Sequence, residues 1–187
     1  METVIKQRTI NVEEYYKMAE AGIIGPEEKV ELINGKIFEM SPIGARHAFV
    51  VKNLLRVLSK LSAEEFTLGI QDPIRLDNNS EPEPDVSVAK GDISKYQNNH
   101  PTSKDLLLIV EVAESTLNFD RDVKIPLYAS SGIKEYWIVN IPENQIEVYQ
   151  SPQGNNYSSK SIYTQGDKIT LLESEFTVSV RDILGNK

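Results

Sequence analysis

The chain has 187 residues and no cysteine, which suits a single domain over residues 1–187 and excludes disulfides, thiolate metal sites and a cysteine nucleophile. No segment approaches the ~18 apolar residues of a membrane span, and the start of the chain lacks the apolar core of a signal peptide, so we expect a cytoplasmic protein with no membrane partner. The net charge of −8, from 28 acidic and 20 basic residues without a basic run, argues against tight non-specific binding to DNA, although a divalent metal or a local groove can offset it.

The first predicted element is a helix from Asn11 to about Ala21. Asn11 is a suitable N-cap, and Glu14 stands three residues later, as in a capping box. Apolar side chains from Val12 onward fall close to one stripe, and Gly22 ends the pattern.

A β-hairpin and a second helix are predicted next. Asn34-Gly35 separates the strand-like runs 30–33 and 36–40, and Asn-Gly is the strongest short hairpin signal because both central residues of a type I′ turn need positive φ. The second helix runs from about Gly44 to Ser62, and its apolar face consists of Val50, Val51, Leu54, Leu58 and Leu61. His47 lies on this same face, one turn before Val51.

Four further strands are predicted in the middle of the chain, at 66–70, 74–76, 85–88 and 106–112. The last of them, LLLIVEV, is almost continuously apolar, as expected of a strand that is buried on both faces.

The C-terminal part begins with a helical stretch at about 120–131, ended by Gly132. Pro126 would clash with an earlier carbonyl if a regular helix began at Asp120, so we expect a start near Ile125 or a distorted first turn. The remaining strands are predicted at 135–140, 145–150, 161–163, 168–172 and 176–180, with 151–156 as a turn-rich segment. The fold class is therefore α/β, with a central mixed sheet flanked by helices and an antiparallel C-terminal extension.

Glu111 is the most informative single residue because it interrupts the apolar run LLLIV-E-V. Burying an unpaired carboxylate costs several kcal/mol, so such a residue is usually paired, neutralised or bound to metal. A structural salt bridge and a metal ligand are both compatible with this position.

Asp85 shifts the interpretation of Glu111 toward a metal site. It follows Pro84 at the head of a short strand, and two neighbouring strands can bring Asp85 and Glu111 to one end of the sheet. Two carboxylates beside open water positions suit Mg²⁺. Taken alone, Asp85 would be interpreted as an ordinary residue at the end of a turn.

Lys124 is the third candidate, early in the helical stretch that follows Glu111. Its ammonium group can orient the attacking water and stabilise the charge that develops on a phosphate. The alternative is a solvent-exposed helix lysine, which is the commonest role of Lys.

Two other features receive no place in the predicted site. Asp122-Val123-Lys124 has the form D-x-K, but Asp122 lies in a polar, helix-forming stretch and not on a buried strand. Trp137 would stack on a base if it were exposed, but a lone aromatic residue on a strand is more often part of the core.

These residues show a family resemblance. Pro84-Asp85 followed by Glu111-Val112-Ala113 resembles the PD-(D/E)XK nuclease signature, with Ala113 in place of the motif lysine. The chain resembles one branch of that superfamily, the putative restriction endonuclease family of unknown specificity, in which the lysine has moved to the following helix. The matching words span roughly Glu31 to Asn140 and are ELING at 31–35, His47, PDV at 84–86, VEV at 110–112, Asp120, Lys124, Tyr128 and GIKEYW at 132–137.

The resemblance implies a restriction-endonuclease-like core and a set of roles. Asp85 and Glu111 would hold Mg²⁺ or Mn²⁺ with the Val112 carbonyl as a third ligand, and Lys124 would act as the migrated lysine. Glu31 would be an additional acidic residue of the site, and His47 would contact phosphate or protonate a leaving oxygen. The alternatives are a surface carboxylate at the hairpin edge for Glu31 and a helix-packing histidine for His47.

Three functional hypotheses follow. The first is an endonuclease that hydrolyses phosphodiester bonds in DNA with Mg²⁺ or Mn²⁺, acting as a homodimer as restriction-type enzymes usually do. The second is a catalytically weak or inactive module for nucleic-acid binding or protein interaction, which the acidic charge and the displaced lysine leave open. The third is an α/β domain in which buried Glu111 merely pairs with Lys124. Binding of Mn²⁺ through Asp85 and Glu111 separates the first from the others.

Overall fold

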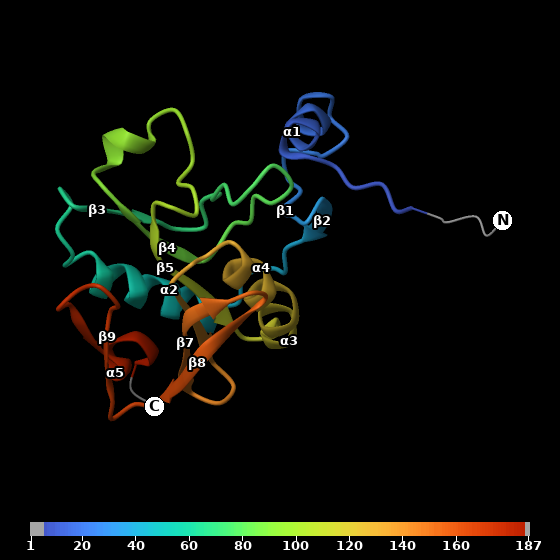
Figure 1. The fold of residues 1–187 in the computed structure, drawn as a ribbon. Helices are drawn as coiled ribbons and strands as arrows, with labels where there is room; N and C mark the ends of the chain where they lie inside the picture. Colours follow the sequence, from blue (N-terminus) through green and yellow to red (C-terminus); the bar gives the residue numbers. More distant parts are fainter. Residues whose placement is uncertain (1–5, 186–187) are drawn as a thin grey trace.

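A six-stranded mixed sheet forms the centre of the computed structural model, which describes residues 6–185 (Figure 1). Its strands lie side by side in the order β3 (Phe66–Gly69), β4 (Val86–Lys90), β5 (Leu106–Ala113), β6 (Glu135–Asn140), β7 (Gln145–Gln153) and β8 (Asn156–Tyr163). All neighbours are antiparallel except β5 and β6, which are parallel. The prediction of an α/β fold with a central mixed sheet is confirmed.

The parallel pair β5–β6 requires a crossover, because parallel strands cannot be joined by a tight turn. Three short helical segments form it: α3 (Leu117–Phe119), the π-helical turn η2 (Asp120–Lys124) and α4 (Ile125–Ser130). They pack on one face of the sheet, where Ile109 of β5 and Tyr136 of β6 meet Tyr128 of α4 in one buried cluster.

The opposite face of the sheet is covered by α2 (Ala45–Leu58) and α5 (Val180–Leu184). Alternate residues of β5 therefore belong to different layers, since side chains alternate across a strand. Leu108, Val110 and Val112 pack toward α2, and Ile109 and Ala113 pack toward α4. Glu111 lies on the same face of β5 as Ile109 and Ala113, so its carboxylate is on the side of the sheet that α4 covers.

The N-terminal predictions are confirmed in detail. In α1 (Val12–Glu20), Asn11 is the N-cap and both hydrogen bonds of a capping box with Glu14 are present. The strands β1 (Val30–Ile33) and β2 (Lys36–Glu39) form the predicted hairpin, with φ of +49° at Asn34 and +73° at Gly35. A side chain at Gly35 would also collide with Thr9, so this position requires glycine both for its positive φ and for lack of space.

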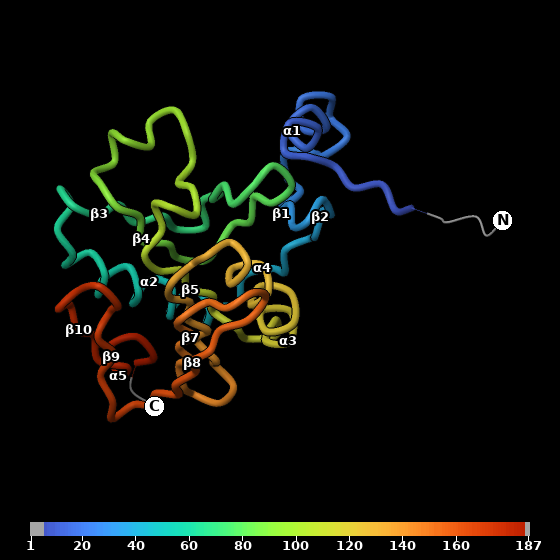
Figure 2. Tube along the Cα trace, in the orientation of Figure 1, coloured from blue at the N-terminus to red at the C-terminus, as the bar shows by residue number. Residues whose placement is uncertain are grey.

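The C-terminal extension consists of β9 (Lys168–Thr170) and β10 (Thr177–Ser179), an antiparallel pair separate from the central sheet. Figure 2 shows this red segment beside α5 and α2, at the edge of the molecule away from α1. One further short element, the 3-10 helix η1 (Ile93–Tyr96), lies between β4 and β5. No helix among residues 6–185 has the length and apolar character needed to cross a membrane.

Three predicted boundaries are wrong. Residues 74–76 form no named strand, because Leu76 N–H donates to Ser80 O in a turn and Arg75 makes only an isolated bridge. The second helix ends at Leu58 instead of Ser62, where Leu61 N–H donates to Leu58 O in a tighter turn. Residues 151–156 continue the β7–β8 hairpin, which turns at Gly154.

Candidate active site

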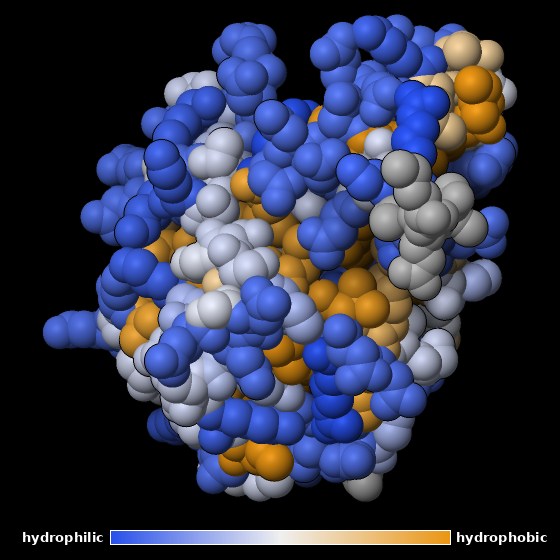
Figure 3. All heavy atoms as spheres, turned by 45° about the vertical axis from the view of Figure 1, so that its right-hand side comes forward, coloured by the Kyte–Doolittle hydropathy of each residue, from blue (hydrophilic) through white to orange (hydrophobic). Residues whose placement is uncertain are grey.

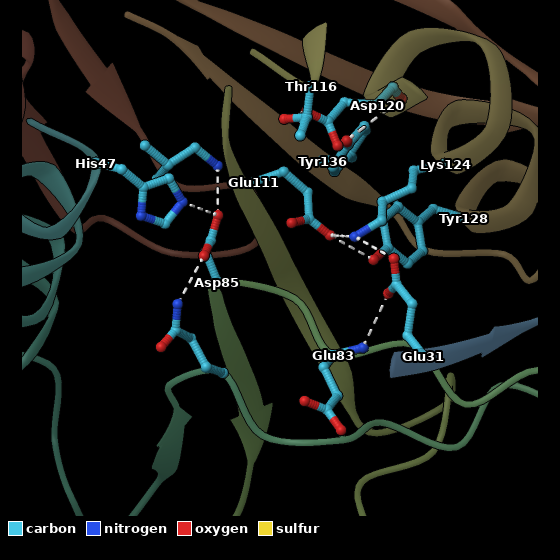
Figure 4. Close-up of polar contacts among 12 residues, drawn as sticks. Glu31, His47, Glu83, Asp85, Glu111, Thr116, Asp120, Lys124, Tyr128 and Tyr136 are labelled. Atoms are coloured by element: carbon cyan, nitrogen blue, oxygen red, sulfur yellow. Dashed lines mark hydrogen bonds and ion pairs between the residues drawn. The ribbon is translucent and has the colours of Figure 1, made fainter. Parts of the chain in front are cut away.

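One cavity of about 390 Å³ brings the predicted site residues together. It lies among the β1–β2 hairpin, the start of α2, the ends of β4 and β5, and the turn η2. Its lining includes all six residues selected from the sequence: Glu31, His47, Asp85, Glu111, Val112 and Lys124. Figure 4 shows the Glu111 carboxylate between Asp85 on one side and Lys124 on the other.

Asp85 immediately precedes β4 and is held by three donors. Its Oδ2 accepts hydrogen bonds from the Val112 backbone N–H at 2.8 Å and from His47 Nε2 at 3.0 Å, and its Oδ1 accepts one from Gln71 Nε2 at 3.2 Å. The β4–β5 register ends at the pair Val86–Val110, so the Val112 N–H on this side lies beyond the paired residues of β4. The carboxylate is thereby fixed directly beside β5.

Glu111 is buried in the middle of the site, with 4% of its surface exposed. Its Oε1 accepts hydrogen bonds from Lys124 Nζ at 2.8 Å and from the Tyr128 hydroxyl at 2.7 Å. Burial raises the pKa of Glu111 to about 8; Lys124 opposes the rise, and the carboxylates of Asp120, Asp85 and Glu31 add to it. Without a further positive charge, this carboxyl group is therefore substantially protonated at neutral pH.

Lys124 is buried on η2, so the alternative of an exposed helix lysine is wrong. Its Nζ lies 2.8 Å from Glu111 Oε1 and 3.3 Å from Glu31 Oε1. Burial alone would lower the pKa of Lys124, but the carboxylates of Glu111, Glu31 and Asp120 raise it above its usual value. The lysine therefore stays charged, and its ammonium group is shared between two acids.

The π-helical turn that carries Lys124 follows from Pro126. Proline lacks a backbone N–H and disfavours a regular helix before it. Here the Ile125 N–H donates to Asp120 O, five residues back, and α4 then begins at Ile125 with Pro126 in its first turn. The distorted start expected from the sequence is confirmed, and it directs both Lys124 and Tyr128 toward Glu111.

Glu31 and His47 approach the site from opposite sides. Glu31 is 4% exposed, so the alternative of a surface carboxylate is wrong; its Oε2 accepts the Glu83 backbone N–H at 3.2 Å. His47 is half-buried, and the hydrogen bond to Asp85 raises its pKa although burial opposes the rise. Its Nδ1 is buried without a partner among residues 6–185. Since Nε2 is engaged with Asp85, this arrangement favours holding Asp85 over protonating a leaving group.

Three further residues contribute to the site although they were not selected from the sequence as site residues: Asp120 and Gln71 line the cavity, and Tyr128 contacts Glu111. Asp120 is buried and accepts a hydrogen bond from Thr116 Oγ1 at 2.8 Å; burial is the main cause that raises its pKa to about 6. Tyr128 bonds to Glu111, and Gln71 bonds to Asp85. Asp120 and Tyr128 belong to the words that carry the family resemblance, so their spacing from Lys124 was an available signal. Gln71 has no such signal.

The two rejected candidates lie outside the cavity. Asp122 is exposed on the outer side of η2. Trp137 is fully buried and its Nε1 donates to Glu135 Oε1 at 2.6 Å, so it belongs to the core as its position on a strand suggested.

The donor set fits a hard divalent cation. Seven carboxylate side chains line the cavity beside one lysine and one histidine, which leaves excess negative charge; they are Glu31, Glu39, Glu83, Asp85, Glu111, Glu114 and Asp120. Carboxylate and carbonyl oxygens suit Mg²⁺ or Mn²⁺. Within residues 6–185, no three His, Asp or Glu side chains form a metal-binding group by themselves. A cation here would keep open positions for water, as Mg²⁺ usually does in proteins.

Comparison with known proteins identifies two similarities. The model of the Uma2 family, described as "putative restriction endonuclease", matches residues 12–181. A solved structure described as a putative nuclease belonging to DUF820, from Anabaena variabilis ATCC 29413, superposes with a TM-score of 0.73 at 17% identity and covers 94% of this chain and 97% of that chain. At this identity the superposition shows a shared fold. No curated protein matches the chain.

Proposed function

Because the chain belongs to the Uma2 family of putative restriction endonucleases, we propose that it is a metal-dependent nuclease that hydrolyses phosphodiester bonds in DNA. The observation that supports this most directly is the buried set of Asp85, Glu111 and Lys124 around one cavity. Two carboxylates and a protonated lysine are the groups that hydrolysis of a phosphodiester needs close together.

We assign the binding of Mg²⁺ or Mn²⁺ to the carboxylates of Asp85 and Glu111 and to the Val112 carbonyl. When bound, the cation would acidify water and offset the charge on the phosphate. The donors to Asp85 leave the orientation of its carboxylate fixed, which is the role that outer partners of metal ligands commonly have. In this proposal His47 is a positioning residue for Asp85.

Lys124 acts on the reacting groups. Its ammonium group lies beside Glu111, where it orients the attacking water and stabilises the negative charge that develops on the phosphate oxygens. The water oxygen forms a bond to phosphorus and releases a proton to solvent while the bond to the 3′ oxygen breaks, and the departing oxygen takes a proton from solvent. Glu31 and Tyr128 hold Lys124 and Glu111 in this relation through their own contacts.

Titration of Mn²⁺ tests this assignment. We expect the wild type to bind Mn²⁺ and to cleave DNA in its presence, and the Asp85→Ala/Glu111→Ala double variant to lose both. Asp122→Ala is the matched control, because it removes an exposed carboxylate two residues from Lys124. Unchanged metal-dependent cleavage in the double variant would refute the assignment. Absence of Mn²⁺ binding to the wild type, alone and with DNA, would favour the interaction module.

The family resemblance also supports a two-fold homodimer on duplex or partly duplex DNA. Sedimentation equilibrium of the purified chain tests this part separately, since a monomeric chain can still bind Mn²⁺ at Asp85 and Glu111.

A further inference from the structure

A second cavity, of about 770 Å³, adjoins the candidate active site. The two cavities share five lining residues at their boundary: Met40, Ser41, Ile43, Gln71 and Glu83. Gln71 also donates to Asp85, so the second cavity begins one side chain away from a proposed metal ligand. Its size lies within the range of small-molecule sites.

One wall of the second cavity is aromatic and apolar. It is formed by α1 and the loop that follows it, in the upper right of Figure 1. Tyr15 and Tyr16 contribute their rings, which meet edge to face at 5.9 Å. The Tyr15 hydroxyl is tied to Val30 O at 2.9 Å, and Tyr16 remains 40% exposed. In Figure 3, patches of apolar residues lie among hydrophilic ones on this face, one of them at the upper right.

The charges of this cavity exclude phosphate as its occupant. Glu28, Glu81 and Glu83 line it, and Lys29 is the only basic residue among its lining residues. Glu81 is paired with Arg75, which leaves Glu28 and Glu83 as the acids facing the space. An acidic cavity next to a phosphate-cleaving centre suits the uncharged parts of a nucleotide, its base and sugar, and repels the backbone.

Glu83 supplies a free acceptor at the boundary. Figure 4 shows its carboxylate directed away from Glu31, to which its backbone N–H is bonded. Among residues 6–185, no side chain donates a hydrogen bond to this carboxylate, although the residue is half-buried. A carboxylate in such a position accepts from an exocyclic amino group, as Glu and Asp accept from cytosine N4.

We infer that this cavity binds the base and sugar of one unpaired nucleotide next to the scissile phosphate, with the base on Tyr16 and its exocyclic amino group on Glu83. This inference rests on the proposed nuclease function and narrows its substrate to DNA that has an unpaired or extruded nucleotide at the cleavage point. It further assigns a preference for cytosine, adenine or guanine over thymine, which has no exocyclic amino group.

Nucleosides test the cavity without metal and without cleavage. We would titrate deoxycytidine, thymidine and deoxycytidine 5′-monophosphate into metal-free protein and follow the Tyr16 and Glu83 signals by NMR. The expected order of affinity is deoxycytidine, then its monophosphate, with thymidine weakest. Tyr16→Ala should lower deoxycytidine affinity about tenfold, since a stacked base is lost, and Tyr16→Phe should keep it.

Glu83→Gln tests the proposed hydrogen bond between the exocyclic amino group of the base and the Glu83 carboxylate. Its amide can donate as well as accept, so the preference for deoxycytidine over thymidine should fall by about tenfold while thymidine binding is retained or improved. Phe49→Ala is the matched control for Tyr16→Ala, because Phe49 is 44% exposed and lies outside both cavities. Titration of Mn²⁺ into each variant reports separately on the metal site.

The outcomes distinguish the two proposals. Nucleoside binding that depends on Tyr16 supports the inference even if Mn²⁺ binding or cleavage fails, which would refute the nuclease function alone. A wild type that shows no deoxycytidine binding at millimolar concentration overturns the inference, as does equal weakening by Tyr16→Ala and Phe49→Ala. Tighter binding of the monophosphate than of the nucleoside in metal-free protein would also overturn it, because the cavity would then accept phosphate.

Discussion

Replacement of Glu111 by glutamine should stabilise the metal-free protein, and more so at higher pH. The side chain keeps its shape and an oxygen that can accept from Lys124 and Tyr128, but it loses the carboxylate that burial disfavours. The pKa of Glu111 is about 8 in the folded protein and 4.5 ordinarily. Because the folded-state pKa is the higher one, the protonated Glu111 carboxyl group makes its full contribution to the stability of the wild type below pH 4.5. This contribution is lost as pH rises toward 8.

The size of this effect follows from the interval between the two values. One pKa unit corresponds to 1.36 kcal/mol, so the advantage of Glu111→Gln over the wild type should grow by about 3 kcal/mol between pH 5.5 and pH 8. Addition of Mn²⁺ at a hundred times its Kd should reduce the advantage of Glu111→Gln by about 2.7 kcal/mol, since such a ligand stabilises only the protein that binds it.

Urea unfolding followed by fluorescence measures these changes. Trp137 is the single tryptophan and is fully buried, so its emission reports on the core. Equal destabilisation of Glu111→Gln at pH 5.5 and pH 8, with no response to Mn²⁺, would refute the reasoning and show an ionised structural pair with Lys124.

Glu147→Gln is the control of opposite sign. Burial alone would raise the pKa of Glu147, but hydrogen bonds from Arg121, Lys160, Tyr149 and Asn140 lower it to about 2. Its contribution to stability is therefore present above pH 4.5 and is lost as pH falls toward 2. Glu147→Gln should consequently destabilise the protein at both pH 5.5 and pH 8.

Two further substitutions distinguish residues that bind Mn²⁺ from residues that act beside the Mn²⁺ ligands. Lys124→Met should abolish cleavage while Mn²⁺ binding persists. It should also destabilise the metal-free protein by up to about 3–5 kcal/mol, because Glu31 loses its buried cation and Glu111 loses a hydrogen-bond donor. Restoration of that stability by Mn²⁺ in urea unfolding checks this expectation, and full cleavage activity would contradict it. Gln71→Gly should leave the free energy of unfolding nearly unchanged, since relief of a positive φ of 53° offsets the lost hydrogen bond to Asp85. The affinity for Mn²⁺, measured by calorimetry, should nevertheless fall, and an unaltered affinity would remove Gln71 from the site.

Local chemistry explains which parts of the fold could be predicted from the sequence. Asn11 and Glu14 interact within one helical turn, and Asn34-Gly35 sets its own turn geometry, so both elements follow from residues that are neighbours in sequence. Glu111 was conspicuous for a related reason, because one charged residue in an apolar strand is visible without any knowledge of its partners.

The unpredicted residues of the site depend on contacts between distant segments. Gln71 lies in a loop, and only the folded chain brings its amide to Asp85, 14 positions later. Glu83 reaches the boundary of two cavities through a backbone contact with Glu31, 52 positions earlier. Residues 74–76 have a strand-like composition, but a turn closed by Ser80 removes them from the sheet. Patterns of period two contain no information on such pairings.

In the proposed site, Lys124 replaces the lysine that the motif would place at position 113, and tertiary contacts make this possible. Residues 111 and 113 lie on the same face of β5, so a lysine at 113 would project beside Glu111. Ala113 instead packs in the buried cluster with Ile33 and Ile138, which leaves no room there for a long cationic side chain. The π-helical turn before Pro126 supplies the ammonium group from the other side, at 2.8 Å from Glu111. The proposed hydrolysis requires a cation at that carboxylate, and the element that carries the cation is free to change.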